Sequence, residues 1–105
     1  MADIIEAAGA IDSHLSALTE EKAPESIVID AVKYNLVAIG EAAGRLSGEL
    51  VSVHPEVEWG AVRGLRNVLT HEYFRVRTDL ILQIATDSVP KLLASAQAIL
   101  GEEDA

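Results

Sequence analysis

The sequence has no cysteine, few prolines and few aromatic side chains. Its 105 residues include three prolines, one tryptophan, two tyrosines and one phenylalanine. Without cysteine the chain can form no disulfide, no thiolate metal site and no cysteine nucleophile. This composition suits the reducing cytosol. A chain of this length makes one domain, which is large enough to fold around a single core without disulfides or metals.

The sequence also lacks a targeting segment and a long apolar run. Met1 is followed by Ala-Asp-Ile-Ile-Glu, with no basic leader. No stretch approaches the roughly 20 apolar residues that a helix needs to span a bilayer. We therefore expect a cytoplasmic protein without a signal peptide or membrane anchor. Because helical periodicity starts almost at Met1, we also expect the domain to begin abruptly, within a helix.

Positive charge is scarce and unevenly distributed. Eight Lys and Arg stand against 17 Asp and Glu, for a formal net charge of −9. This balance argues against a protein that coats DNA or RNA through cationic groups. Half of the basic residues, however, lie between positions 63 and 77, where only Glu72 opposes them: Arg63, Arg66, Arg75 and Arg77. We interpret this strip as a candidate anion site, with Arg63, Arg75 and Arg77 as candidate RNA contacts; a chance patch of solvated charge is the alternative.

Apolar residues recur at helical spacing through most of the chain, and no strand pattern occurs. Steps of three and four residues indicate an amphipathic first helix that carries Ile4, Ala8, Ile11, Leu15 and Leu18. A second helix is predicted from about Glu25 to Leu46, with Gly48 as its stop. Gly40 and Gly44 lie four residues apart in it, so they share a face that would let another helix approach closely.

The second half of the chain continues the helical pattern with interruptions. Residues 51–58 are predicted to connect the second helix to a third, which ends near His71. A fourth helix follows, and Pro90 should kink or restart it because proline has no N–H to donate. The pattern predicts an all-α, up-and-down bundle of four or five helices. We expect the chain to form a single helical domain over residues 1–101, followed by a frayed acidic tail at 102–105.

Side chains that handle phosphate or protons are concentrated in one stretch, Arg66 to Tyr73. Arginine carries a fixed planar charge that suits a phosphate, and histidine is the side-chain type that titrates near neutral pH. The phenol of Tyr73 is a candidate acceptor for a modifying group. Each residue of a straight helix advances about 100°, so Arg66 and His71 point about 140° apart, whereas Asn67 and His71 share a face.

Two arrangements would bring Arg66 and His71 to one phosphate. The helix could end before His71, or a second copy of the chain could supply the complementary groups across a two-fold axis. We favour the second arrangement, which predicts a homodimer with a composite site. The other histidines, His14 and His54, are remote in sequence and have no ligand spacing with His71. We therefore predict no metal site and no cofactor.

Imidazole and guanidinium groups without a metal suit the cleavage of RNA. One histidine removes the proton from a ribose 2′-OH, and an acid protonates the leaving 5′-oxygen. Arginine neutralises the charge that grows on the phosphorus oxygens. The products would be a 2′,3′-cyclic phosphate and a 5′-OH end, and DNA, which lacks the 2′-OH, should resist cleavage.

Each of these residues also has a purely structural interpretation. His71 could interact with the carbonyls at a helix C-terminus, and Arg66 could pair with Glu41. Asn67 could form a local hydrogen bond, and Tyr73 could lie at the edge of the core with its hydroxyl in water. From spacing alone, the functional and the structural interpretations both stay open.

The stretch is similar to the motif of a known family. Its residues read R-N-x-L-x-H-x-Y without a gap, which resembles the R-x4-H-x-Y motif of HepT-type toxins in the HEPN superfamily. The matching positions are Arg66, Asn67, Leu69, His71 and Tyr73. The resemblance covers about residues 27–95 and includes an N-L-x-x-I-G-E-A-A helix at 35–43, the segment His54 to Trp59 and the late Pro90.

The resemblance implies an all-α, dimeric, metal-independent endoribonuclease that serves as the toxin of a type II-like or type VII toxin–antitoxin module. Arg66 and His71 would be catalytic, and Asn67 would help to orient them. The implied partner is an MntA-type nucleotidyltransferase antitoxin that transfers AMP from ATP onto Tyr73. Phosphates added there would fill the anion site and repel RNA.

Two alternatives from other classes stay open. The chain could be a non-catalytic HEPN protein that binds a nucleotidyltransferase and is modified by it, which would fit the net acidity and the presence of Glu72. It could also be a structural helical adaptor, in which Arg66 and His71 would be replaceable.

Overall fold

Helices account for most of the chain, and the all-α prediction is confirmed. The computed structural model describes residues 1–104, without the side chains of 103 and 104, and contains no strand over that range. Within it, no helix is long and apolar enough to cross a membrane. The elements are α1 (Ala2–Thr19), α2 (Glu25–Gly44), α3 (Gly48–Val53), α4 (Trp59–His71), α5 (Thr78–Gln83), the π-helical segment η1 (Ile84–Ser88) and α6 (Val89–Asp104).

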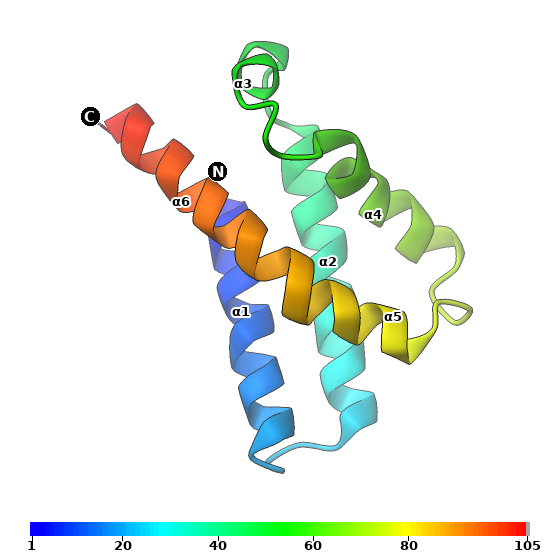
Figure 1. Cartoon of the computed structure of the whole chain (residues 1–105). Helices are drawn as coiled ribbons and strands as arrows, with labels where there is room; N and C mark the ends of the chain where they lie inside the picture. The colour runs from blue at the N-terminus through cyan, green and yellow to red at the C-terminus, as the bar shows by residue number, and fades with distance from the viewer. Residues whose placement is uncertain (105) are drawn as a thin grey trace.

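The central element is α2, and three other parts of the chain pack on it. α1 and α2 form an antiparallel hairpin, and α4 packs on another side of α2 (Figure 1). α5, η1 and α6 follow one another as a single rod (Figure 1). The first part of this rod, α5, crosses α2, and its later part, mainly α6, crosses α1. The long helices alternate in direction, as expected for an up-and-down bundle. α2 is therefore the helix against which the other elements are positioned.

The core is almost wholly aliphatic. One cluster of buried residues joins the middle of α1 and α2 to the end of α4 and to the α5–η1 region. A second cluster joins the N-terminal end of α1 and the C-terminal end of α2 to Trp59 and α6. Trp59 is 4% exposed, and its indole N–H donates to the carbonyl of His54 at 3.0 Å, which fixes the start of α4. Each fully buried aliphatic side chain contributes about 1.5–3 kcal/mol relative to an exposed one.

The helical rod continues past Pro90 without interruption. Proline has no N–H, so Pro90 cannot donate to the carbonyl four residues before it. The residues ahead of it widen into the π-helical segment η1, where the N–H of Val89 donates to the carbonyl of Ile84, five residues back. The hydroxyl of Thr86 donates to the carbonyl of Leu82 at 2.8 Å. The α-helix restarts at Val89, as the sequence predicts.

The predicted end of the second helix is wrong. α2 ends at Gly44 rather than at Leu46, and Gly48 does not stop α2 but opens the short α3. The hydroxyl of Ser47 caps α3 by accepting from the N–H of Leu50 at 3.1 Å, a stronger local signal than the glycine beside it. α6 extends as far as Asp104, and the fraying expected of the acidic tail stays a prediction. Residue 105 lies outside the described residues.

α4 approaches α2 most closely at Gly40. A Cβ atom placed on Gly40 would lie 2.7 Å from the backbone nitrogen of Arg66 and 3.2 Å from the carbonyl oxygen of Val62. A Cβ on Gly44 would meet nothing within 4 Å. The sequence therefore predicts the close helix contact correctly at Gly40 but not at Gly44. The absence of a side chain at Gly40 lets the first residue of the R-x4-H motif pack directly on α2.

Replacing Gly40 tests this contact. We expect Gly40→Ala to destabilise the fold by on the order of 1–3 kcal/mol, because the new methyl group collides with backbone, which cannot rotate away. Gly44→Ala is the matched control and should be neutral or slightly stabilising, since nothing opposes its Cβ and alanine favours helix. Urea unfolding followed by circular dichroism measures both. Equal stabilities of the two variants would contradict the close contact.

Candidate functional site

The motif residues Arg66, Asn67 and His71 all lie on α4. The helix runs through His71, which is its last residue, and the N–H of Glu72 closes the turn by donating to the carbonyl of Val68 at 2.8 Å. The arrangement in which the helix ends before His71 is therefore excluded. Arg66 and His71 stay about 140° apart around one regular helix, so a single copy does not aim both at the same phosphate.

Arg66 extends from α4 onto α2. Its Nε donates to the Oε1 of Glu41 at 3.1 Å, which confirms the ion pair expected from the sequence. Both side chains are about half exposed, 51% for Arg66 and 46% for Glu41. A pair in such contact with water contributes about 0–1 kcal/mol. The guanidinium is thus held in place weakly enough to exchange Glu41 for a phosphate.

Asn67 and His71 are exposed on another face of α4. They are four residues apart on a regular helix, so their side chains are neighbours, as the sequence predicts. The imidazole of His71 stands at the C-terminal end of α4, in contact with solvent.

Tyr73 lies in the turn after α4 and is bound to α2 at three points. Its hydroxyl donates to the Oδ1 of Asp30 at 3.0 Å, at the surface of the molecule. The Nζ of Lys33 donates to the Tyr73 carbonyl at 2.7 Å and lies 4.5 Å from the centre of the phenol ring. Burial raises the pKa of Tyr73, and the hydrogen bond and negative charge of Asp30 raise it further.

The same turn presents Phe74 to solvent. The N–H groups of Arg75 and Val76 both donate to the carbonyl of Glu72, at 2.8 and 3.0 Å. Phe74 is 96% exposed, and its ring meets that of Tyr73 edge-on with 5.3 Å between centroids. The turn therefore places one large aromatic side chain outside the core within three residues of His71.

In the folded chain, groups of the protein itself bind the arginines of the basic strip, so the strip is less positive than its sequence suggests. Arg63 donates from Nε to the carbonyl of Ala43 at 3.0 Å and from Nη2 to that of Leu46 at 3.3 Å, so it binds the end of α2 and the segment just after it. Arg75 pairs with Glu72 at 3.7 Å, and Arg77 forms a two-bond pair with Asp79. The RNA contacts proposed for these arginines stay predictions, and each would have to exchange a partner within the chain.

His54 has a structural environment distant from the motif. Its Nδ1 lies 3.1 Å from Glu56 and its Nε2 lies 3.5 Å from Glu102, so it joins the segment before α4 to the end of α6. Among the side chains that the structure describes, those of residues 1–102, no three of His, Cys, Asp or Glu gather into a set that could hold a metal ion.

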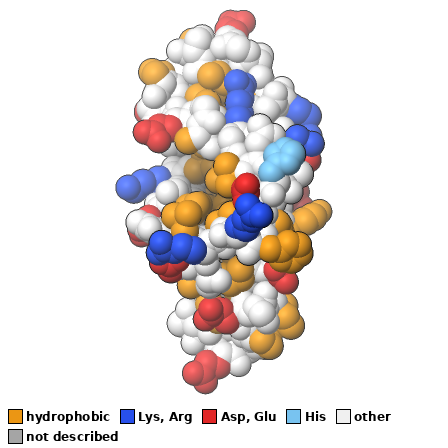
Figure 2. Space-filling model, turned by 90° about the vertical axis from the view of Figure 1, so that its right-hand side faces the viewer, with side chains coloured by type: hydrophobic (Ala, Val, Ile, Leu, Met, Phe, Trp, Pro, Cys, Tyr) orange, Lys and Arg blue, Asp and Glu red, His pale blue; other side chains and the backbone are white. Residues whose placement is uncertain are grey.

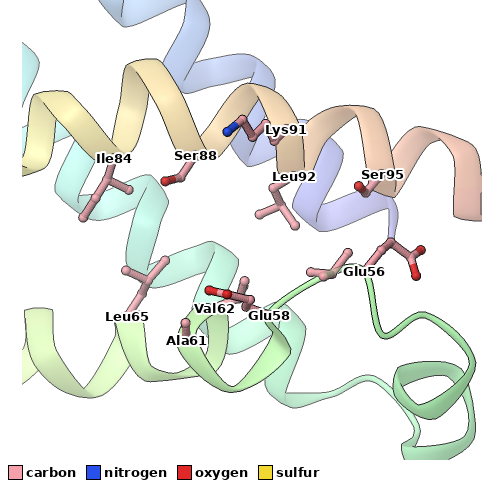
Figure 3. A pocket seen from close by; sticks show the side chains of 11 residues that line it. Glu56, Glu58, Ala61, Val62, Leu65, Ile84, Ser88, Lys91, Leu92 and Ser95 are labelled. Atoms are coloured by element: carbon pink, nitrogen blue, oxygen red, sulfur yellow. The ribbon is translucent and has the colours of Figure 1, made fainter.

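A groove of about 510 Å³ runs between the first half of α4 and the η1–α6 part of the rod. Figure 3 shows Ala61, Val62 and Leu65 on α4 facing Ile84 and Leu92 across it, with Lys91 and Glu58 at its rim. None of the motif side chains lines this groove. The candidate site is therefore a surface site rather than a cleft within one chain.

Sequence reasoning missed two residues that bind the motif tyrosine. Asp30 and Lys33 lie 43 and 40 residues before Tyr73, in the middle of a helical pattern. Their spacing of three places them on one face of α2, but nothing local indicates which segment that face meets. Only the packing of α4 on α2 brings them to the turn.

Comparison with known proteins places these features in a family. The family model described as "Ribonuclease HepT-like" matches residues 4–99. The Caldanaerobacter subterraneus protein named "Putative RNase TTE0752" is 31% identical over 84 residues, which cover 80% of this chain and 75% of that protein.

Two further relatives match over shorter lengths. "Putative RNase MJ1380" of Methanocaldococcus jannaschii is 33% identical, over 66% of this chain and 63% of its own length. "Probable ribonuclease HepT" of Thermococcus cleftensis is 31% identical, over 59% of this chain and 56% of its own length. The chain thus spans less than two thirds of these two relatives. No solved structure matches the chain significantly. With a family match over nearly its whole length, the chain belongs to the HepT-like ribonuclease family.

Proposed function

We propose that this chain is a metal-independent endoribonuclease, the toxin of a toxin–antitoxin module, which acts as a homodimer with a composite site. The observation that carries the proposal is the placement of Arg66 and His71. Both are exposed on α4, yet they lie on different sides of it. One copy cannot direct both at one phosphate, whereas two copies related by a two-fold axis can offer Arg66 from one and His71 from the other.

The distribution of exposed apolar side chains supports a second copy near the motif. Five of the six large hydrophobic side chains exposed on the described residues belong to α2 or to positions 68–80, namely Ile27, Tyr34, Val68, Phe74 and Leu80. Figure 2 draws the face that forms the right-hand side of Figure 1. Hydrophobic side chains gather there at mid-height, beside a histidine and several Lys and Arg. Apolar surface concentrated in this way is typical of an interaction face.

The chemistry follows from the side chains that such a dimer would bring together. The imidazole of His71 accepts the proton of the ribose 2′-OH, whose oxygen attacks the phosphorus, and an acid protonates the 5′-oxygen as its bond to phosphorus breaks. Arg66 moves from Glu41 to the phosphate and balances the charge that grows on its oxygens. Asn67, which shares the face of His71, helps to orient the imidazole.

Cleavage of an unpaired RNA in the presence of EDTA tests the activity. We expect the wild type to leave 2′,3′-cyclic phosphate and 5′-OH ends and to spare DNA of the same sequence. His71→Ala and Arg66→Ala should each lose at least about 100-fold in rate, the usual worth of a general acid–base or charge-balancing group. His14→Ala is the control for loss of a histidine far from the motif and should keep wild-type rate. Metal-dependent cleavage, or full activity in His71→Ala, would sink the proposal.

A second candidate is a HEPN protein that binds a nucleotidyltransferase without cleaving RNA itself. The net charge of −9 and the carboxylate partners of Arg66, Arg75 and Arg77 favour it, because RNA must compete with these partners. A wild-type protein that accepts AMP but leaves RNA intact would support this candidate over the ribonuclease.

We also propose that an MntA-type nucleotidyltransferase neutralises the chain by transferring AMP to Tyr73. The phenol stands two residues after His71, so a bound adenylyl group adds bulk and negative charge where RNA would lie. With ATP and a purified MntA-type nucleotidyltransferase, intact-mass measurement should show added adenylyl groups. Tyr73→Phe should abolish the gain, and Tyr34→Phe, the other phenol, should keep it. Undiminished labelling of Tyr73→Phe would contradict this assignment.

A further inference from the structure

The phenol of Tyr73 is held with its O–H directed at a carboxylate. The Oδ1 of Asp30 accepts the hydrogen bond at 3.0 Å, and Lys33 fixes the backbone of Tyr73 through its carbonyl at 2.7 Å. Lys33 is 7% exposed, which leaves its side chain little freedom, and its charge lies over the phenol ring. Both the oxygen of Tyr73 and its main chain are therefore positioned by one face of α2.

A phenol must lose its proton in order to be modified. Burial and Asp30 raise the pKa of Tyr73, so free phenolate is scarcer here than on an ordinary tyrosine. The proton must therefore leave while the new bond forms, and an acceptor must already be in place. A carboxylate at hydrogen-bond distance from the attacking hydroxyl fills this role in protein kinases, where it accepts the proton of the substrate hydroxyl.

We propose that Asp30 is the general base for nucleotidyl transfer onto Tyr73, so that this chain supplies part of the chemistry of its own modification. The inference rests on the proposed modification of Tyr73. The phenol oxygen attacks the α-phosphorus of a nucleoside triphosphate and forms the new P–O bond. The bond from that phosphorus to the pyrophosphate oxygen breaks, and its electron pair leaves with pyrophosphate. The phenol proton passes to the carboxylate of Asp30 and from there to water.

The surroundings of Asp30 permit this role. In the single chain its side chain is exposed on α2, so a modifying enzyme that binds one copy can approach the Asp30–Tyr73 pair from solvent. The residue is also separate from the groups proposed to cut RNA, since Arg66 pairs with Glu41 further along α2 and His71 stands at the end of α4. Loss of the base should therefore slow modification and leave the ribonuclease groups in place.

Two substitutions separate proton transfer from mere orientation. In Asp30→Asn the amide oxygen still accepts the hydrogen bond of the phenol but takes no proton, whereas Asp30→Ala removes both functions. We expect the rate of AMP transfer to fall by about 100-fold or more in both variants, the usual worth of a general base. If Asp30 only oriented the phenol, Asp30→Asn would keep the wild-type rate and Asp30→Ala alone would be slow. Asp12→Asn, an exposed carboxylate on α1, is the control and should react like the wild type.

The transfer is measured with two AMP donors, by intact mass against time. One is ATP with a purified MntA-type nucleotidyltransferase, and the other is adenosine 5′-phosphorimidazolide, an activated AMP donor that needs no enzyme. The rate of Asp30→Asn should recover as the pH rises, because phenolate needs no base. Circular dichroism and thermal unfolding check that each variant is folded.

The outcomes distinguish the two proposals. A wild type that receives no AMP at Tyr73 from either donor overturns the modification and, with it, the role of Asp30. A wild type that is modified, together with an Asp30→Asn variant modified equally fast at neutral pH, overturns the role of Asp30 and leaves the modification standing. Slow transfer to Asp30→Asn that recovers at high pH supports both.

Discussion

The contact between α4 and α2 at Gly40 is the constraint on which the site depends. A backbone nitrogen of α4 packs where any larger residue would place a Cβ atom, so the distance between the two helices has little room to change. That distance brings Arg66 within reach of Glu41 and sets the turn after α4 against Asp30 and Lys33. A glycine in the C-terminal part of α2 therefore decides where the charged groups of a different helix lie.

Much of the fold follows from local signals in the sequence. Apolar spacing predicts the long helices, and the missing N–H of Pro90 predicts the restart at Val89. The errors occur where two local signals compete: the hydroxyl of Ser47 caps a new helix where Gly48 suggested a stop.

The residues of the candidate site could be predicted from the sequence, but the groups that bind them could be predicted only in part. Side-chain types and spacing single out Arg66, His71 and Tyr73, and helical geometry shows that Arg66 and His71 diverge. The pair between Arg66 and Glu41 could be anticipated, because both carry charge at exposed helical positions. The hydrogen bond from Tyr73 to Asp30 could not, since it depends on how two helices pack across more than 40 residues of sequence. Long-range packing also provides the partners that offset the basic strip.

The central claim is that Arg66 and His71 act together only across two copies of the chain, and subunit complementation tests it most directly. Arg66→Ala and His71→Ala proteins, each inactive alone, are mixed in equal amounts, allowed to exchange subunits, and assayed for RNA cleavage. A mixed dimer contains one site with both groups intact, so random exchange should restore about a quarter of wild-type activity. If the mixed dimer forms and the mixture cleaves no more RNA than the two variants alone, the composite site is contradicted.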